Sequence, residues 1–126
     1  MHPIAVLGAG SWGTALSVHL ARLGHDVRLW GRDAALVERL AISRVNDDYL
    51  PGVALEGVRP TTSIEDAVAG VSLVVVAVPS QGLRAVVHRA VPHVPSAVPF
   101  LSATKGLEHG TLYLSLIHIS EPTRPY

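Results

Sequence analysis

The sequence predicts an α/β fold class with a doubly wound parallel sheet. Apolar runs typical of buried strands alternate with amphipathic helical segments along the chain. The first run, Ile4 to Leu7, leads into Gly8-Ala9-Gly10-Ser11-Trp12-Gly13, a G-x-G-x-x-G turn placed where a helix begins. After this turn, apolar residues recur at helical spacing as far as Gly24. Strand, glycine-rich turn and helix in this order indicate the first unit of such a sheet.

Each glycine of this turn has its own expected role. Gly8 permits the tight turn, Gly10 lets the backbone approach a pyrophosphate, and Gly13 lets the helix pack closely on the strand. The N–H groups at the start of the helix can bind the anion. The alternative, that the glycines serve packing alone, stays open, although the flanking strand and helix favour the dinucleotide-binding interpretation.

The first half of the chain is expected to alternate regularly. We predict a strand at about 3–8, a helix at 12–23, a strand at 26–30 and a helix at 34–43. A segment containing Pro and Gly then runs from Val45 to Pro60, with a short strand near Val58. This alternation predicts βαβ winding.

The second half continues the pattern. Ser63 and Asp66 form a predicted capping box for a helix that reaches Ala69 and ends at Gly70. Leu73 to Val78 is continuously apolar, as expected for a central strand covered on both faces, and Pro79 ends it.

Ser80 is expected to cap the next helix. Leu83, Val86, Val87 and Ala90 form one apolar face of that helix, which Pro92 and Pro95 end before a strand near Val98 to Ala103. Right-handed crossovers then give five parallel strands in the order 3-2-1-4-5, a Rossmann-type sheet. Its ligand crevice lies at the carboxyl ends of strands one and four.

Composition bounds the class of protein. The chain has 126 residues, enough for about one domain, and its ten basic and ten acidic residues cancel, which argues against a nucleic-acid partner. Cysteine is absent, which excludes disulfides and thiol chemistry. The apolar run from Val71 to Pro79 is too short to insert across a membrane, and the N-terminus lacks a basic signal-peptide region, so a cytoplasmic location is the default expectation.

The last residues of the chain do not continue the pattern of the residues before them. Residues 114–126 resemble a translated sequencing adaptor, so we expect a dinucleotide-binding domain over 1–113 and a non-native tail after it. The alternative is a genuine edge strand from Leu112 to Ile119. If the adaptor interpretation holds, the chain is a fragment of a longer protein.

The residues after the second predicted strand bear on which nucleotide binds. Arg32 stands nearest the place where an acidic residue usually binds the ribose of NAD. A guanidinium there suits the 2′-phosphate of NADP, so NADPH is favoured, and the cofactor is predicted as NADP or NAD. Asp33 could bind a ribose or cap the following helix. Ser11 and Trp12, at the helix entrance, offer N–H groups, a hydroxyl and an aromatic face to the cofactor; packing is the alternative role of Trp12.

Lys105 is the single lysine of the chain and follows the fifth predicted strand, at the crevice. An ammonium there can neutralise a phosphate or donate to a substrate hydroxyl, whereas the alternative is a solvated loop lysine. The seven histidines show no H-E-x-x-H pattern, so no metal site is predicted. Asn46 to Pro51, which includes Tyr49, is rich in turn formers and by itself is typical of a surface loop.

Five blocks of residues carry a resemblance to a known family. They are Gly8 to Leu16, Leu29 to Arg32, Asn46 to Pro51, Ala77 to Ser80 and Ala103 to Glu108. Together, and in this order, they resemble the N-terminal domain of bacterial NAD(P)-dependent sn-glycerol-3-phosphate dehydrogenase. The resemblance covers residues 4 to about 112.

The resemblance implies reduction of dihydroxyacetone phosphate to sn-glycerol 3-phosphate, a phospholipid precursor, by the full-length protein. It implies that Ser11, Trp12, Arg32 and Lys105 contact the cofactor, that Lys105 also contacts the substrate, and that Asp33 and Tyr49 contribute less. The family's proton-transfer lysine belongs to a C-terminal helical domain that this sequence lacks. No catalytic residue is therefore assigned, and we expect a chain that binds cofactor without turnover and is marginally stable.

Two alternatives stay open beside this interpretation. The chain could be a stand-alone NAD(P)-binding sensor module if it truly ends near residue 126. It could belong to another dehydrogenase of the same superfamily, although the Asn46 to Pro51 and Thr104-Lys105-Gly106 blocks argue against that. A homodimer of the full-length protein is compatible with the resemblance.

Overall fold

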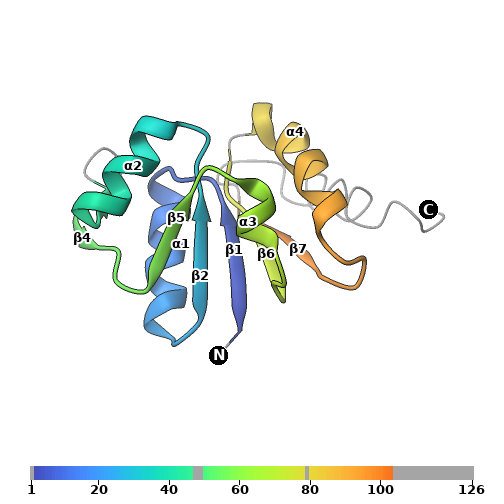
Figure 1. Ribbon diagram of the computed structural model, residues 1–126, viewed down its shortest axis with the longest axis horizontal. Helices are drawn as coiled ribbons and strands as arrows, with labels where there is room; N and C mark the ends of the chain where they lie inside the picture. Colours follow the sequence, from blue (N-terminus) through green and yellow to red (C-terminus); the bar gives the residue numbers. More distant parts are fainter. Residues whose placement is uncertain (1, 47–49, 79, 104–126) are drawn as a thin grey trace.

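The computed structural model describes residues 2–46, 50–78 and 80–103. Within these ranges, five strands pair in parallel in the order β5-β2-β1-β6-β7 (Figure 1). Their bounds are β1 (Pro3–Leu7), β2 (Asp26–Trp30), β5 (Val58–Thr61), β6 (Leu73–Val76) and β7 (Phe100–Ser102). This is the predicted 3-2-1-4-5 order, with the first strand at the centre of the sheet, and it confirms the Rossmann-type fold.

The helices cover both faces of the sheet. Their bounds are α1 (Ser11–Arg22), α2 (Ala34–Ser43), α3 (Ile64–Val68), α4 (Ser80–Ala90) and a 3₁₀ turn, η1 (Val91–His93). One apolar cluster joins α3 and α4 to the sheet, and a second joins α1 and α2 to the opposite face. The layers are therefore helix, sheet and helix, as a doubly wound fold requires.

The two central strands are apolar along their length because neither face of the sheet is open there. Ala5, Val6 and Leu7 of β1 are fully buried, and so are Val74 and Val76 of β6. Burying a valine or leucine side chain contributes about 1.5–3 kcal/mol relative to exposure. The continuous apolar runs predicted for these strands are thus confirmed.

Several predicted boundaries differ from the structure. β6 ends at Val76 rather than at Val78, and the last strand is shorter than the predicted Val98 to Ala103. Ser80 is the first residue of α4 rather than the residue before it. In β6 and in the last strand, the apolar pattern persists for one or two residues beyond the ladder hydrogen bonds that define the element.

The segment after α2 was predicted as irregular, and this was wrong in part. It contains an antiparallel pair of strands, β3 (Val45–Asn46) and β4 (Leu50–Ala54), separate from the main sheet. β4 includes Pro51 and Gly52, residue types depleted in strands, which is why the sequence pattern indicated a loop.

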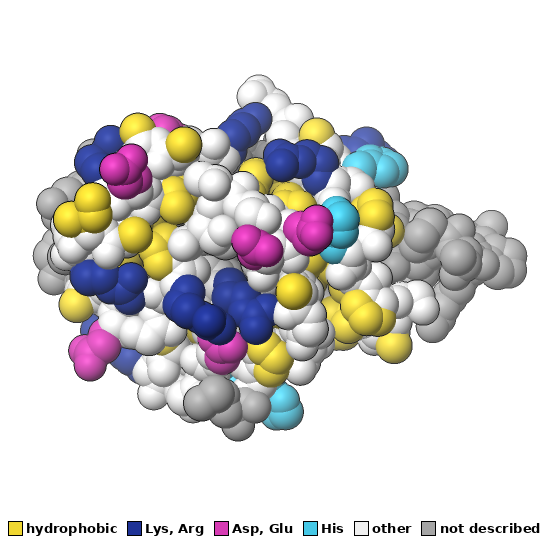
Figure 2. Space-filling view, viewed as in Figure 1, with side chains coloured by type: hydrophobic (Ala, Val, Ile, Leu, Met, Phe, Trp, Pro, Cys, Tyr) yellow, Lys and Arg dark blue, Asp and Glu magenta, His cyan; other side chains and the backbone are white. Residues whose placement is uncertain are grey.

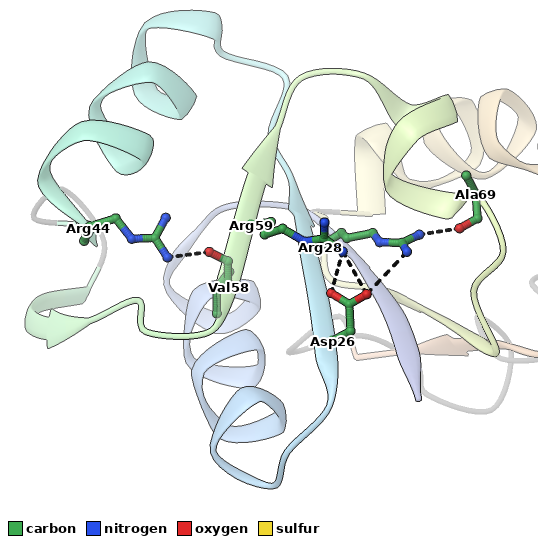
Figure 3. Close-up of polar contacts among 6 residues, drawn as sticks. All are labelled: Asp26, Arg28, Arg44, Val58, Arg59 and Ala69. Atoms are coloured by element: carbon green, nitrogen blue, oxygen red, sulfur yellow. Dashed lines mark hydrogen bonds and ion pairs between the residues drawn. The ribbon is translucent and has the colours of Figure 1, made fainter. Parts of the chain in front are cut away.

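Arg44 fixes this antiparallel pair to the domain. Its backbone is left-handed (φ 60°) at the C-cap of α2, and its carbonyl accepts from the N–H of Leu55 at 2.8 Å. Its guanidinium donates to the carbonyls of Leu55 and Val58, both at 2.6 Å. Figure 3 shows the contact with Val58. One arginine thus connects the end of α2 to the start of β5.

The residues of β2 and β5 alternate because one face of the sheet is partly open to solvent at these two strands. Val27, Leu29 and Val58 are buried toward α1 and α2, whereas Asp26, Arg28 and Arg59 lie on the other face. Basic and acidic side chains lie side by side on this face in Figure 2. The short helix α3 does not cover it completely.

The charged residues on this face form one network (Figure 3). Arg59 donates to both carboxylate oxygens of Asp26, at 2.7 and 2.8 Å, and Arg28 pairs with the same carboxylate at 3.4 Å. Arg28 also donates to the carbonyl of Ala69, just after α3. The hydrogen bond from Arg59 is the main reason that the pKa of Asp26 lies below its ordinary value.

The β1–α1 turn is held by contacts that leave no room for side chains. Gly8 has φ +127°, and a Cβ there would lie 2.8 Å from the carbonyl oxygen of Ala77. A Cβ on Gly13 would lie 1.8 Å from the carbonyl oxygen of Gly8. The N–H of Gly8 donates to the carbonyl of Trp30 at 2.9 Å, which fixes the turn to the end of β2. Close packing of the helix on the strand therefore requires glycine at both positions.

Gly13→Ala is expected to destabilise the domain by at least about 1–3 kcal/mol, the usual cost of overpacking a site that cannot relax. The added methyl group meets the backbone of the turn rather than a movable side chain. Urea unfolding followed by circular dichroism measures the change. An unchanged unfolding midpoint would show that the turn and helix are not packed as described.

Asp26→Asn is expected to lower stability at pH 7 by about 0.2–1 kcal/mol, the range for exposed ion pairs. Because the pKa of Asp26 is lowered on folding, its stabilising effect is present above the unfolded value, near 3.8, and is lost as the pH falls through the folded value. The urea midpoints of the two proteins should therefore differ at pH 7, and the difference should be smaller at pH 3. Glu56→Gln, at an exposed position, is the control. A difference of equal size at both pH values would contradict the assignment.

Candidate functional site

A pocket of about 600 Å³ opens at the carboxyl ends of β1, β2 and β6. This is the edge of the sheet where the sequence placed the ligand crevice. Its lining comes from the β1–α1 turn, the β2–α2 connection, the segment after β6 and the first turns of α4: Gly8, Ala9, Gly10, Ser11, Trp12, Trp30, Gly31, Arg32, Asp33, Leu36, Ala77, Val78, Gly82 and Val86. Seven of the predicted cofactor residues lie in the described part of the chain. Six of them line the pocket, and the seventh, Gly13, packs against Gly8 of the lining.

The N-terminus of α1 points its free backbone N–H groups at this pocket. Gly10 is the N-cap and makes no side-chain capping hydrogen bond, and Thr14 donates to the carbonyl of Gly10 at 2.9 Å. The first N–H groups of the helix therefore have no acceptor within it. The first turn also contains no acidic residue to offset the positive end of the helix dipole. These are the features of an anion-binding helix end.

Gly10 is the glycine of the motif that the fold itself does not need. Its backbone is extended (φ −77°, ψ −170°), a conformation open to any residue, and a Cβ there would meet no atom of the described residues within 4 Å. Packing explains Gly8 and Gly13 but leaves Gly10 unexplained. A ligand that approaches the backbone closely at this point would explain it.

Arg32 lies at the rim of the pocket with its charge uncompensated. It is exposed, and within the described ranges it makes no hydrogen bond or ion pair. In contrast, the guanidinium groups of Arg28, Arg44 and Arg59 are all engaged within the fold. Arg32 is thus available to an anionic ligand in the pocket.

Asp33 caps α2. Its carboxylate accepts from the N–H groups of Ala35 and Leu36, at 3.0 and 3.3 Å. Of the two roles left open for Asp33 by the sequence, the structure contains the capping one. Asp33 also lies on the pocket lining.

Two tryptophans line the pocket in different environments. Trp12, at the entrance of α1, is 47% exposed, so it is not a core packing residue. Trp30, at the end of β2, is buried, and its Nε1 donates to the carbonyl of Thr62 at 2.9 Å. The guanidinium of Arg89 lies 5.5 Å from the centre of the Trp30 ring. Trp30 is therefore held rigidly as part of the pocket floor.

Sequence reasoning did not select Trp30, Ala77, Val78 or Gly82 as site residues. The signal for the first three was their position, since each comes at or just after the carboxyl end of a strand that borders the crevice. Gly82 gave no such signal, because its place beside the pocket depends on how α4 packs. Tyr49 and Lys105 lie outside the described residues, and their roles stay predictions.

The described lining can bind but offers little acid–base chemistry. Arg32 and Asp33 are its ionisable side chains, and the Asp33 carboxylate is already engaged as a helix cap. Over residues 2–46, 50–78 and 80–103, no three His, Cys, Asp or Glu side chains come together as metal ligands. Nor does any helix in these ranges have the length and apolarity needed to cross a membrane.

Comparison with solved structures supports the fold. A crystal structure of glycerol-3-phosphate dehydrogenase from Coxiella burnetii matches with a TM-score of 0.85 at 35% sequence identity. The match covers 95% of this chain and 38% of that one.

Curated relatives give the same result. Glycerol-3-phosphate dehydrogenase (NAD(P)+) of Bacillus velezensis is 42% identical over 122 residues, which cover 96% of this chain and 34% of the relative. The enzyme of the same name from Xanthomonas euvesicatoria is 47% identical over 111 residues, covering 87% of this chain and 33% of the relative. The chain therefore spans about a third of the length of these relatives.

The family model described as the NAD-dependent glycerol-3-phosphate dehydrogenase N-terminus matches residues 3–124. The resemblance carried by the five sequence blocks is thereby confirmed. The glycine turn, the open helix end and the sheet order agree with this match. The chain therefore belongs to the family of NAD-dependent glycerol-3-phosphate dehydrogenase N-terminal domains.

Proposed function

We propose that this chain binds NADPH in preference to NADH, with the cofactor diphosphate at the N-terminus of α1. The observation that carries the proposal is Gly10, whose missing side chain serves neither the backbone conformation nor protein packing. The free N–H groups of the first helical turn provide donors for the diphosphate. Ser11 and Trp12 lie at the same helix entrance and contribute their N–H groups, hydroxyl and ring.

Arg32 supports the preference for the phosphorylated cofactor. A phosphate on the adenosine ribose carries charge that an unengaged guanidinium can bind in a bidentate manner. Asp33, the acidic residue that could instead bind the ribose hydroxyls of NADH, is used to cap α2. Both features favour NADPH at this rim of the pocket.

In the full-length protein, we propose that this domain serves the reduction of dihydroxyacetone phosphate to sn-glycerol 3-phosphate in the cytoplasm. The names of the curated relatives support the reaction class, and the nicotinamide would supply hydride transfer to the carbonyl carbon. The chain's own part is to hold and orient the cofactor. Lys105 and Tyr49 are proposed to contact the cofactor, and Lys105 also the substrate phosphate or hydroxyl. The 126-residue chain is proposed to bind without turnover, because its described lining holds no free acid–base pair.

Titration with NADPH tests the proposal directly. Trp12 and Trp30, the two tryptophans of the chain, both line the pocket, so bound NADPH should quench their fluorescence and saturate. If the folded chain showed no saturable quenching, the proposal would be refuted. Consumption of NADPH with dihydroxyacetone phosphate would refute the claim that turnover is absent.

Gly10→Val is expected to fold normally and to lose NADPH affinity at least about tenfold. The side chain enters open space, so stability is preserved, but it blocks the approach of a charged group to backbone donors, each worth about 1.5–3 kcal/mol. Ala85→Val, on an exposed position of α4, is the matched control. If Gly10→Val bound NADPH as tightly as the control, the diphosphate could not lie at this turn.

Arg32→Leu is expected to weaken NADPH binding by about ten- to a hundredfold and NADH binding much less, because it removes charge-assisted hydrogen bonds specific to the 2′-phosphate. Arg22→Leu, at the opposite end of α1, controls for loss of one positive charge. Parallel fluorescence titrations give both dissociation constants. Equal losses of affinity for NADPH and NADH would show that Arg32 contacts a part of the cofactor that the two share.

A further inference from the structure

Gly82 lies in the first turn of α4 and lines the pocket, as does Arg32 of the β2–α2 connection. A Cβ at this position would lie 3.9 Å from Nη2 of Arg32, and apart from the backbone of α4 itself no other atom of the described residues would lie within 4 Å. The Arg32 guanidinium therefore reaches from the end of β2 to α4. Gly82 and Arg32 are therefore neighbours on the lining of the pocket.

Neither the backbone nor packing requires glycine at residue 82. Its φ lies outside the left-handed region, and the contact that a Cβ would make is an ordinary van der Waals distance. Glycine inside a helix is also less favourable than alanine, because it loses more conformational freedom on folding. The missing side chain must therefore be explained by something other than the fold of α4.

What glycine provides here is free volume beside a guanidinium that has no partner in the described part of the chain. Oxygens of a phosphate bound by Arg32 would lie about 2.7–2.9 Å from its nitrogens, so the phosphate needs space directly next to the guanidinium. A ribose hydroxyl needs much less space than a phosphate. The space beside the Arg32 guanidinium would therefore matter more for binding NADPH than for binding NADH.

We infer that Gly82 is a specificity-determining residue of the cofactor pocket, which leaves room for the 2′-phosphate beside Arg32. The inference rests on the proposed binding of NADPH in this pocket. It assigns the preference to a pair of positions on separate elements, Arg32 supplying the charge and Gly82 the space. A side chain at residue 82 can remove the preference while the charge of Arg32 remains.

The test compares Gly82→Leu and Gly82→Ala with Ala85→Leu, an exposed position on the same helix. Dissociation constants for NADPH and NADH come from fluorescence titration of the 126-residue chain. Gly82→Leu should lose about tenfold or more in NADPH affinity, as expected when a charge-assisted contact is blocked, and less than about twofold in NADH affinity. Gly82→Ala should lose less NADPH affinity than Gly82→Leu, because its methyl group fills only part of the space beside Arg32.

Thermal unfolding separates this role from a structural one. Both Gly82 variants should melt at the same temperature as the unmodified chain or a few degrees higher, because each replaces a helical glycine with a better helix former. Adenosine 2′,5′-bisphosphate and adenosine 5′-monophosphate, used as competitors, should show the same selective loss because they carry the adenosine end alone.

The outcomes are distinguishable. If the unmodified chain binds neither cofactor, the proposed function fails, and this inference fails with it. If the unmodified chain binds NADPH but Gly82→Leu weakens both cofactors equally, or neither, the proposed function stands and the role of Gly82 is refuted.

Discussion

The backbone of the β1–α1 turn lies so close to the start of α1 that no side chain fits at Gly13, and the rest of the molecule is arranged around this contact. The carbonyl of Gly8 occupies the place where a Cβ of Gly13 would lie. The N–H of Gly8 in turn donates to β2, and the N–H of Ala77 donates to the carbonyl of Leu7. The turn is thereby fixed to three strand ends at once. Because the backbone is held so tightly, the open end of α1 has a fixed position in the pocket.

Arginine has two distinct uses in this domain. Arg28, Arg44 and Arg59 bind carbonyls or a carboxylate of the fold and connect α2, α3 and the outer strands. Arg32 has no such contact in the described ranges and lies at the pocket rim. Positive charge committed to the fold is therefore separated from positive charge available to a ligand. The Asp33 carboxylate next to Arg32 is held by α2, which limits its ability to neutralise that charge.

The sequence predicted the main sheet and most of the pocket because those features depend on local patterns. The buried strands Ile4 to Leu7 and Leu73 to Val76 read as apolar runs, and the glycine spacing located the turn. The β3–β4 pair was missed because Pro51 and Gly52 disfavour strands, while the contacts that hold the pair to the domain come from Arg44, eleven residues before Leu55. The cap at Asp33 is local, and it is one of the two roles that the sequence left open. The place of Gly82 depends on packing between elements, which a single sequence does not contain. Arg44 itself adopts φ 60° without being glycine, which no local pattern indicated.

The most direct test of the account is to observe which amides respond to the cofactor. Backbone amide resonances of the ¹⁵N-labelled chain, recorded during titration with NADPH, report contact residue by residue. The account predicts that the largest shifts occur at Gly10, Ser11, Trp12 and Gly13, because their N–H groups lie at the helix end facing the pocket. Unchanged resonances at these four residues, with the largest shifts around Asp26 and Arg59 at the face below α3, would contradict it.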